Sequence, residues 1–196
     1  MRAEKWKELK SYIEELKTIS VEPVLTSSLF LSIEGAYYHL NNGKTIYREK
    51  IKKDTGDGSA AIVLPITEDG KCILSVEPRV HTKKTVGIGF PAGYINQGES
   101  YLEASSRELL EETGYQADHL QYLAEFYQDE GCSAAYNYGV LATGCRKVGS
   151  QELDVGEFIR YFLCDFEDVE ELIDKKYILG ANSQLIYEKA RRLLKK

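Results

Sequence analysis

The sequence is poor in cysteine and has no long hydrophobic run, and both absences restrict the classes of protein that it can encode. Its four cysteines form no Cys-x-x-Cys pair and show no zinc-ligand spacing, so we interpret them as buried or incidental thiols in a reducing compartment. Residues 1–20 are charged and contain no apolar core of the signal-peptide type, and no apolar run approaches the length of a membrane span. We therefore expect a cytoplasmic protein with no membrane partner.

Positive charge is in deficit, because 25 Lys and Arg stand against 31 Asp and Glu, which gives a net charge of −6 and a pI near 5.3. This balance argues against a general nucleic-acid binder, although a metal and a few local cations can still hold a small nucleotide. Repeats, low-complexity segments and Pro/Gly/Ser-rich linkers are absent. The 196 residues, 43% of them hydrophobic, suffice for the core of one domain with an extension.

The most clearly bounded element is a predicted helix over Tyr101–Thr113. Gly98 interrupts the preceding segment, and Ser100 followed three residues later by Glu103 forms the pattern of a capping box. The helix itself contains neither Pro nor Gly. Gly114 then stands where a left-handed residue is needed to end a helix.

The same helix concentrates negative charge on one stripe. Glu108, Glu111 and Glu112 are spaced i, i+3 and i+4, so their carboxylates converge and repel one another. Arg107 can reach Glu111 one turn away, but most of the negative charge remains unpaired. A hard divalent cation with oxygen ligands, Mg²⁺ or Mn²⁺, is the natural partner of such a cluster.

Around this helix the residue spacing resembles the Nudix box of pyrophosphohydrolases. The matching positions are Gly93, Glu99, Arg107, Glu108, Leu109, Glu111, Glu112 and Gly114. Tyr115 departs from the box, because it is bulkier than the aliphatic residue usual at the last position. The alternative reading, a solvated acidic helix, leaves the register of Gly93, Glu99 and Gly114 unexplained.

The resemblance implies a set of metal ligands and an orienting arginine. The implied ligands are the carboxylates of Glu108, Glu111, Glu112 and Glu99 and the backbone carbonyl of Ala92, which precedes the box. We expect Arg107 to orient a glutamate of the box by bidentate hydrogen bonding rather than to contact substrate.

The catalytic group is expected to comprise Glu111, Arg107 and a general base from a later loop. Glu152 and Glu157 both fit the position of the base, and we favour Glu157 because it directly precedes the strand-like sequence FIRYF. Either could be an ordinary loop acid. Arg79, at a predicted strand end, resembles a phosphate-contacting arginine, with a solvated charge as the alternative.

The order of predicted elements indicates an α/β (α+β) fold, a mixed sheet between helices. The predicted strands are Ser28–Leu40, Lys44–Lys52, Ser59–Ile66, Lys71–Val80, Leu120–Tyr127, Ala134–Thr143 and Glu157–Phe166. The other predicted helices are Glu4–Ile19, Glu167–Lys175 and Asn182–Lys195. Asn42-Gly43 predicts a hairpin turn between the first two strands.

This order is similar to the Nudix fold preceded by an N-terminal helix and an antiparallel ribbon. We expect the extension to cover residues 1–55 and the Nudix domain residues 56–196. In the ADP-ribose and nucleotide-sugar pyrophosphatase branch, which the early strands and Pro91-Ala92-Gly93 resemble, the N-terminal part often completes the partner's substrate site. The resemblance therefore implies a homodimer.

The function implied by the resemblance is Mg²⁺-dependent hydrolysis of the pyrophosphate bond of a nucleoside diphosphate-linked compound. ADP-ribose is the leading substrate, and the products are a nucleoside monophosphate and a sugar phosphate. Gly89 stands where the branch usually has an acidic residue, so the sugar is left open. The alternatives are a non-catalytic nucleotide-sugar sensor and a Nudix hydrolase of another nucleotide sugar, a dinucleotide or a nucleoside triphosphate.

Overall fold

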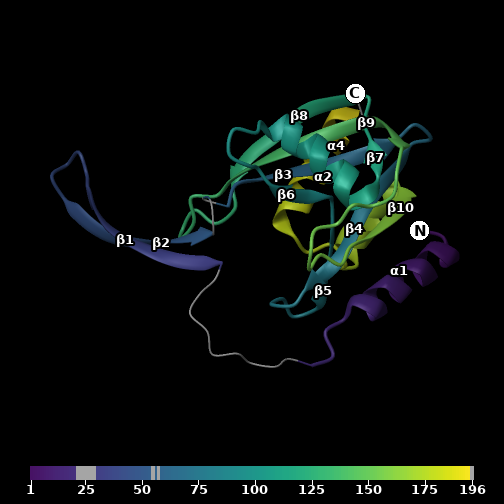
Figure 1. Ribbon diagram of the computed structural model, residues 1–196, viewed down its shortest axis with the longest axis horizontal. Helices are drawn as coiled ribbons and strands as arrows, with labels where there is room; N and C mark the ends of the chain where they lie inside the picture. The colour runs from purple at the N-terminus through teal and green to yellow at the C-terminus, as the bar shows by residue number, and fades with distance from the viewer. Residues whose placement is uncertain (21–29, 54–55, 57, 195–196) are drawn as a thin grey trace.

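The computed structural model describes residues 1–20, 30–53, 56 and 58–194, and within them a mixed sheet forms the centre of the molecule (Figure 1). Its main strand order is β10-β4-β3-β9-β7, with β5 beside β4, β6 beside β3 and β8 beside β9. The strands are β3 (Ala60–Thr67), β4 (Lys71–Arg79), β5 (Thr85–Gly89), β6 (Ala92–Tyr94), β7 (Tyr115–Gln116), β8 (His119–Tyr127), β9 (Tyr136–Lys147) and β10 (Arg160–Asp165). The β3–β9 pair is parallel and the other pairs are antiparallel.

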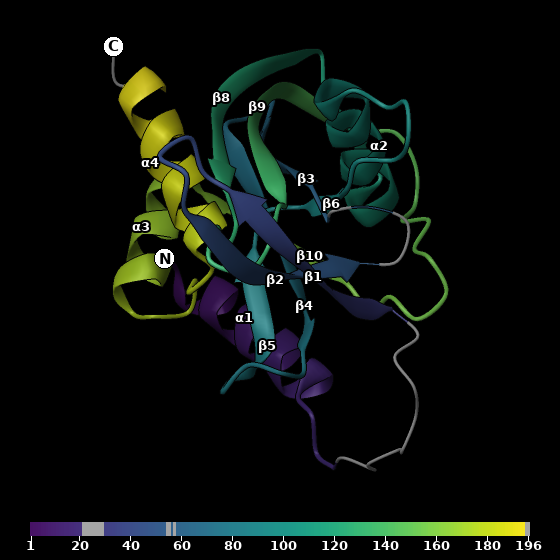
Figure 2. The ribbon, with the colours of Figure 1, turned by 90° about the vertical axis from the view of Figure 1, so that its left-hand side faces the viewer.

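Helices cover both faces of this sheet, which confirms the predicted sandwich (Figure 2). Of the helices in the described residues, α2 (Tyr101–Thr113) lies on one face, and α1 (Ala3–Leu16), α3 (Phe166–Asp174) and α4 (Ala181–Leu194) lie on the other. Alternate residues of β3 therefore enter different cores. Val63 packs with Leu109 of α2, whereas Ile62 and Leu64 pack with the other three helices.

The N-terminal helix is shorter than predicted but packs where its apolar stripe requires. Leu9 is fully buried against the sheet, and Trp6 and Ile13 are partly buried beside it. The predicted end at Ile19 is wrong, because the backbone is already extended at Lys17. The amide of Thr18 then donates to Thr85 Oγ1 at 3.3 Å, a bond outside the helix.

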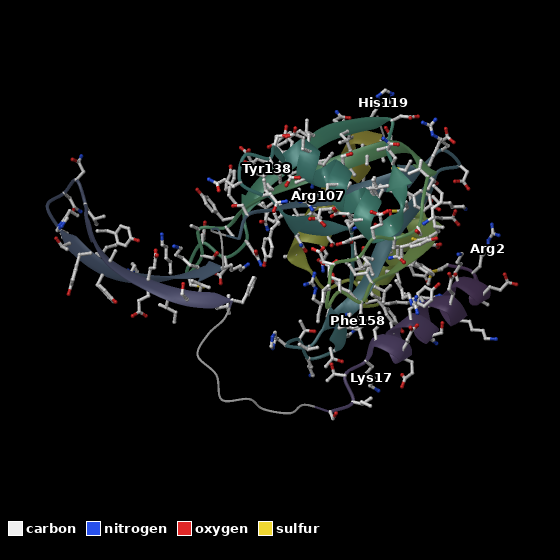
Figure 3. The ribbon with its side chains drawn as sticks, viewed as in Figure 1. Arg2, Lys17, Arg107, His119, Tyr138 and Phe158 are labelled. Carbon is white, nitrogen blue, oxygen red and sulfur yellow. The ribbon has the colours of Figure 1, made fainter. Side chains whose placement is uncertain are left out.

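Strands β1 (Leu31–His39) and β2 (Thr45–Lys53) form the predicted antiparallel ribbon, which projects from the body (Figure 1). Its turn contains Gly43 at φ 80°, as the Asn-Gly sequence predicted. Every residue of β1 is exposed, and the side chains of the ribbon project from both of its sides (Figure 3). Ile51 anchors the near end, since its amide donates to the carbonyl of Cys132 at 2.8 Å. Ser28 and the predicted domain boundary at residue 55 lie outside the described residues.

The last strand begins later than predicted. We expected it from Glu157, but β10 starts at Arg160 because the preceding residues form a turn. The amide of Glu157 donates to the carbonyl of Asp154 at 3.0 Å, and Gly156 has φ 96°. The short strands β5, β6 and β7 were not predicted. In the described part of the chain, no helix is long and apolar enough to cross a membrane.

Candidate active site

Helix α2 has the limits and caps that the sequence predicted. Ser100 Oγ accepts from the amide of Glu103 at 3.3 Å, and Glu103 Oε2 accepts from the amide of Ser100 at 2.8 Å. At the other end Gly114 is left-handed, with φ 69°, and its amide donates to the carbonyl of Leu110. Leu109 faces the core beneath the helix, which fixes the rotation of the carboxylates around its axis.

The carboxylate of Glu108 lies directly against the backbone of Gly93. A Cβ atom at Gly93 would lie 1.9 Å from Glu108 Oε1 and 2.1 Å from Cδ, a separation that no side chain permits. Glycine is therefore required at this position for the helix carboxylate to approach β6. Glu108 is 9% exposed, and its burial raises the pKa of the carboxyl, while hydrogen bonding to Arg107 opposes the rise.

Arg107 connects the helix to the loop before it. Its Nε and Nη2 donate to the two oxygens of Glu99 at 2.8 and 2.9 Å, and Nη2 also donates to the carbonyl of Tyr94 at 2.9 Å. Nη1 donates to Glu108 at 2.6 Å and to Glu111 at 3.0 Å. The geometry expected for an orienting arginine is present, and the bidentate partner is Glu99.

Glu112 is the most deeply buried carboxylate of the helix, at 5% exposure. Its Oε2 accepts from Ser75 Oγ at 2.8 Å and its Oε1 from the amide of Ala92 at 3.4 Å. Burial is the main cause that raises the pKa of Glu112 to about 8, and the nearby charges of Glu77 and Glu108 add to it. A carboxyl with this environment is ready to be neutralised, by a proton or by a cation.

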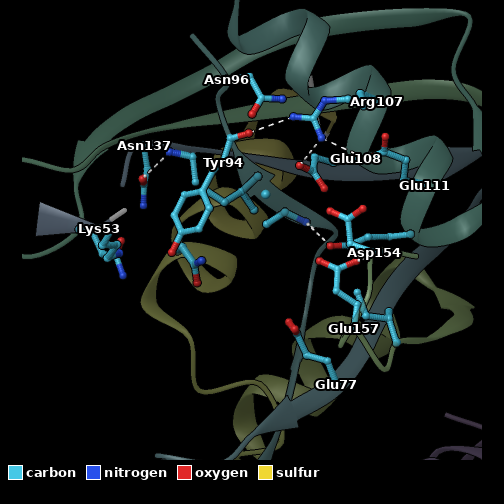
Figure 4. Close-up of a pocket in the computed structure, with 18 of the residues that line it drawn as sticks. Lys53, Glu77, Tyr94, Asn96, Arg107, Glu108, Glu111, Asn137, Asp154 and Glu157 are labelled. Atoms are coloured by element: carbon cyan, nitrogen blue, oxygen red, sulfur yellow. Dashed lines mark hydrogen bonds and ion pairs between the residues drawn. The ribbon is translucent and has the colours of Figure 1, made fainter. Parts of the chain in front are cut away.

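These groups meet in a cavity of about 390 Å³ between α2, β4, β6 and the loop that precedes β10. Among the described residues, six acidic side chains line it: Glu77, Glu108, Glu111, Glu112, Asp154 and Glu157. In the same part of the chain, three cationic side chains line it as well: Lys53, Arg79 and Arg107. Figure 4 shows Glu111, Asp154 and Glu157 on one side of this space, and Lys53, Tyr94 and Asn137 on the other.

The structure brings most of the predicted site residues to this cavity. Arg79 and Ala92 both line it, and Arg79 donates to Glu77 at 2.5 Å. Of the two loop glutamates, only Glu157 is a lining residue, while the exposed Glu152 has its amide bonded to the carbonyl of Glu111 at 2.9 Å. Glu99 lies outside the cavity wall, behind Arg107.

Sequence reasoning missed Ser75, Glu77 and Asp154. Ser75, Glu77 and Arg79 are alternate residues of β4, so they share the face of the strand that looks toward α2. The alternation was a usable signal, although only the packing of β4 under α2 shows that this face meets the carboxylates. Asp154 belongs to the unpredicted turn that ends at Glu157.

The donor set fits a hard divalent cation. All the acidic groups offer oxygen, the type of ligand that Mg²⁺ and Mn²⁺ prefer, and the negative charge exceeds what the three cations can balance. Gly93 leaves room for a carboxylate that any side chain there would displace. Among the described residues, no three His, Cys, Asp or Glu side chains stand close enough to form a ready metal site. The present hydrogen bonds from Arg107 and Ser75 hold the carboxylates instead.

The fold and this site define a class of protein in which a capped helix packs on a mixed sheet and presents its carboxylates to a cavity. The family model of the NUDIX domain matches residues 57–182, and the chain belongs to this family. This match confirms the predicted family and fold. It also confirms the predicted enzyme class, a Nudix pyrophosphohydrolase.

Comparison with individual proteins gives the same family. The chain is 30% identical to the "ADP-ribose pyrophosphatase" of Bacillus subtilis (strain 168), over 86% of this chain and 89% of that protein. It is 27% identical to the "Methanol dehydrogenase activator" of Bacillus methanolicus, over 86% and 89%. A crystal structure titled as that of an ADP compounds hydrolase superposes with a TM-score of 0.73 at 26% identity, over 92% of this chain and 95% of that one.

Proposed function

We propose that this chain hydrolyses the pyrophosphate bond of an ADP-linked sugar, with ADP-ribose as the leading substrate, to AMP and a sugar phosphate. The observation that carries the proposal is the convergence of Glu108 and Glu112 with Gly93 in the acidic cavity. Relatives named for ADP-ribose and ADP compounds support the choice of substrate class.

Mg²⁺ is the proposed cofactor, and Mn²⁺ can take its place. Glu108, Glu112 and Glu111, with the carbonyl of Ala92, would hold the cation, because all four residues line the cavity and offer oxygen ligands. When bound, it supplies charge that neutralises the phosphate oxygens and lowers the pKa of water. Both carboxylate oxygens of Glu99 accept hydrogen bonds from Arg107. Glu99 therefore serves to orient the helix rather than to bind the ion.

The remaining residues position the substrate and move the proton. Glu157, on the loop that faces α2, accepts the proton of the attacking water at a carboxylate oxygen. Arg79 and Lys53 attract the phosphate groups. Tyr94, half exposed on the opposite side of the cavity, offers its ring to the base or the sugar of the nucleotide.

The protein is further proposed to be a cytoplasmic homodimer that pairs through the ribbon of β1 and β2. The exposed apolar side chains of Ile33 and Tyr37, at 72% and 71%, support this, because such groups are usually covered in an assembly. Sedimentation of the full chain and of a variant with Ile33→Lys and Tyr37→Lys measures it. The full chain should sediment as a dimer and the variant as a monomer; a monomeric full chain contradicts the dimer.

A substrate panel tests the proposed activity. The purified protein is incubated with Mg²⁺ and ADP-ribose, other nucleotide sugars, dinucleotides or nucleoside triphosphates, and the products are separated by chromatography. Preferred cleavage of one ADP-sugar to AMP, lost with EDTA, supports the proposal. Tight binding of an ADP-sugar without cleavage of any compound would overturn it in favour of a sensor.

A further inference from the structure

The C-terminal end of α2 is hydrogen-bonded by the last residue of β9 and by the segment that follows this strand. The last carbonyls of a helix have no partner within it and must find one elsewhere. Leu110 finds its partner in the Gly114 amide. The outside donors are the amide of Glu152 to Glu111 at 2.9 Å, Gln151 Nε2 to Glu112 at 2.5 Å and Lys147 Nζ to Thr113 at 2.6 Å.

Two of these bonds connect the proposed metal-binding glutamates to one loop. Glu111 and Glu112 direct their carboxylates toward the cavity, and their carbonyls hold residues 151 and 152. The same chain segment continues into the turn that carries Asp154 and Glu157 to the same side of the cavity as Glu111. The backbone end of the helix and the loop are therefore fixed to each other beside the site.

Gln151 closes this loop as well as anchoring it. Its Nε2 also donates to the carbonyl of Ile159 at 3.1 Å, so one carboxamide joins the helix end to both ends of residues 151–159. Both partners are carbonyl oxygens, and only the NH₂ group of the side chain can donate to them. Ile159 is 5% exposed, which gives the anchor a rigid base.

The turn inside the loop holds Glu157 by short-range bonds to Asp154. The amide of Glu157 donates to the carbonyl of Asp154 at 3.0 Å, and the amide of Asp154 donates to Glu157 Oε2 at 3.1 Å. These bonds fix Glu157 relative to Asp154. The position of the whole turn relative to α2 depends on the contacts of residues 151, 152 and 159.

We propose that Gln151 is a positioning residue for the hydrolysis, because its carboxamide sets the distance between the Glu157 turn and the carboxylates of α2. The inference rests on the proposed function, in which Glu157 is the base. Gln151 lies on the loop side of the helix end and does not line the cavity, so its effect must pass through Glu157. A change at Gln151 moves the base without removing any group that meets substrate.

Gln151→Met removes the donor and keeps the length of the side chain. We expect kcat for the preferred ADP-sugar to fall by about 10- to 100-fold, as for other residues that orient a catalytic group, with little change in KM. Gln184→Met is the matched control, because Gln184 Nε2 also donates to a backbone carbonyl, that of Ile178 at 3.0 Å. The control should keep the kcat of the unchanged protein.

A double-variant cycle separates positioning of Glu157 from general damage. In a Glu157→Gln background, Gln151→Met should leave the residual kcat within about twofold, since the base that it positions is already lost. An equal fold-loss in both backgrounds would show that Gln151 acts on something else, and the proposal would be wrong.

Hydrogen exchange gives a readout that does not depend on activity. Amides of residues 150–159 should exchange faster in Gln151→Met, and those of α2 before residue 110 should not change. Unchanged exchange of the loop contradicts the anchor. If the unchanged protein cleaves no compound, the proposed function fails by itself, and the exchange experiment still decides whether Gln151 holds the loop.

Discussion

The guanidinium of Arg107 donates two hydrogen bonds to the carboxylate of Glu99, from Nε at 2.8 Å and from Nη2 at 2.9 Å. The remaining nitrogen, Nη1, reaches Glu108 and Glu111. One planar group thus ties a loop carboxylate to two helix carboxylates. This arrangement explains how a cluster of like charges persists on one stripe of α2.

Arg107→Lys should reduce turnover by about 10- to 100-fold, because a lysine keeps the charge but cannot bond Glu99 and Glu108 in one geometry. Steady-state kinetics on the preferred substrate measure the loss. Arg146→Lys is the control, since Arg146 forms an exposed ion pair with Asp118 at 2.7 Å far along β9. Equal activity of both variants would contradict the orienting role of Arg107.

Gly93→Ala should displace the carboxylate of Glu108 and lower activity more than stability. The added Cβ would lie 1.9 Å from Glu108 Oε1, whereas at Gly131 the nearest atom would be 3.5 Å away. Gly131→Ala is therefore the control. The measurement is the Mg²⁺ concentration for half-maximal rate, which should rise in Gly93→Ala and stay constant in Gly131→Ala. A constant value in both would show that Gly93 is not needed for cation binding.

The two loop glutamates should differ in their effect on rate. Glu157→Gln should lower kcat by about 10²- to 10⁴-fold, the range for loss of a general base, while Glu152→Gln should change it little. The reason is placement, because Glu157 lines the cavity and Glu152 is exposed beside the helix end. The opposite order of effects would assign the base to Glu152.

The raised pKa of Glu112 predicts how the free energy of unfolding of the metal-free protein depends on pH. Burial raises its pKa to about 8, above the ordinary value of an unfolded glutamate, so the folded state favours the protonated form. The stabilisation is complete below about pH 4.5 and is lost as the pH rises through about 8. The total loss is on the order of 3–5 kcal/mol.

Denaturant unfolding in EDTA at pH 5 and pH 9 measures this loss. In the Glu112→Gln variant, position 112 carries no ionisable group. The free energy of unfolding of the variant should therefore fall less between the two pH values than that of the unchanged protein. Glu108 is present in both proteins, so its own raised pKa contributes to the fall in both. A parallel fall in both proteins would contradict the raised pKa of Glu112.

The helix of the site was predictable to the residue, because its determinants are local. Ser100, Glu103 and Gly114 cap Tyr101–Thr113 through bonds within a few residues of each end. Two β-rich runs joined by Asn42-Gly43 predicted the ribbon for the same reason. The parallel pairing of β3 with β9 joins segments far apart in the chain, so no local sequence pattern predicts it.

The rest of the cavity required the tertiary structure. Ser75 and Glu77 face the site because β4 passes under α2. The local sequence of β4 does not predict which helix packs on it. Glu157 was expected at the start of a strand, but its turn with Asp154 places it before β10. The anchoring role of Gln151 depends on the carbonyls at a helix end, which carry no side-chain signal.

Hydrolysis of ADP-ribose by the unchanged protein and by Glu112→Gln, each with Mg²⁺ and again with EDTA, tests the central claim most directly. The claim is that the carboxylates of α2 make this chain a metal-dependent pyrophosphohydrolase. Circular dichroism checks that the variant keeps its fold. We predict AMP and a sugar phosphate from the unchanged protein with Mg²⁺, and no product above the EDTA background from the folded variant. Near-normal turnover by Glu112→Gln would contradict the account.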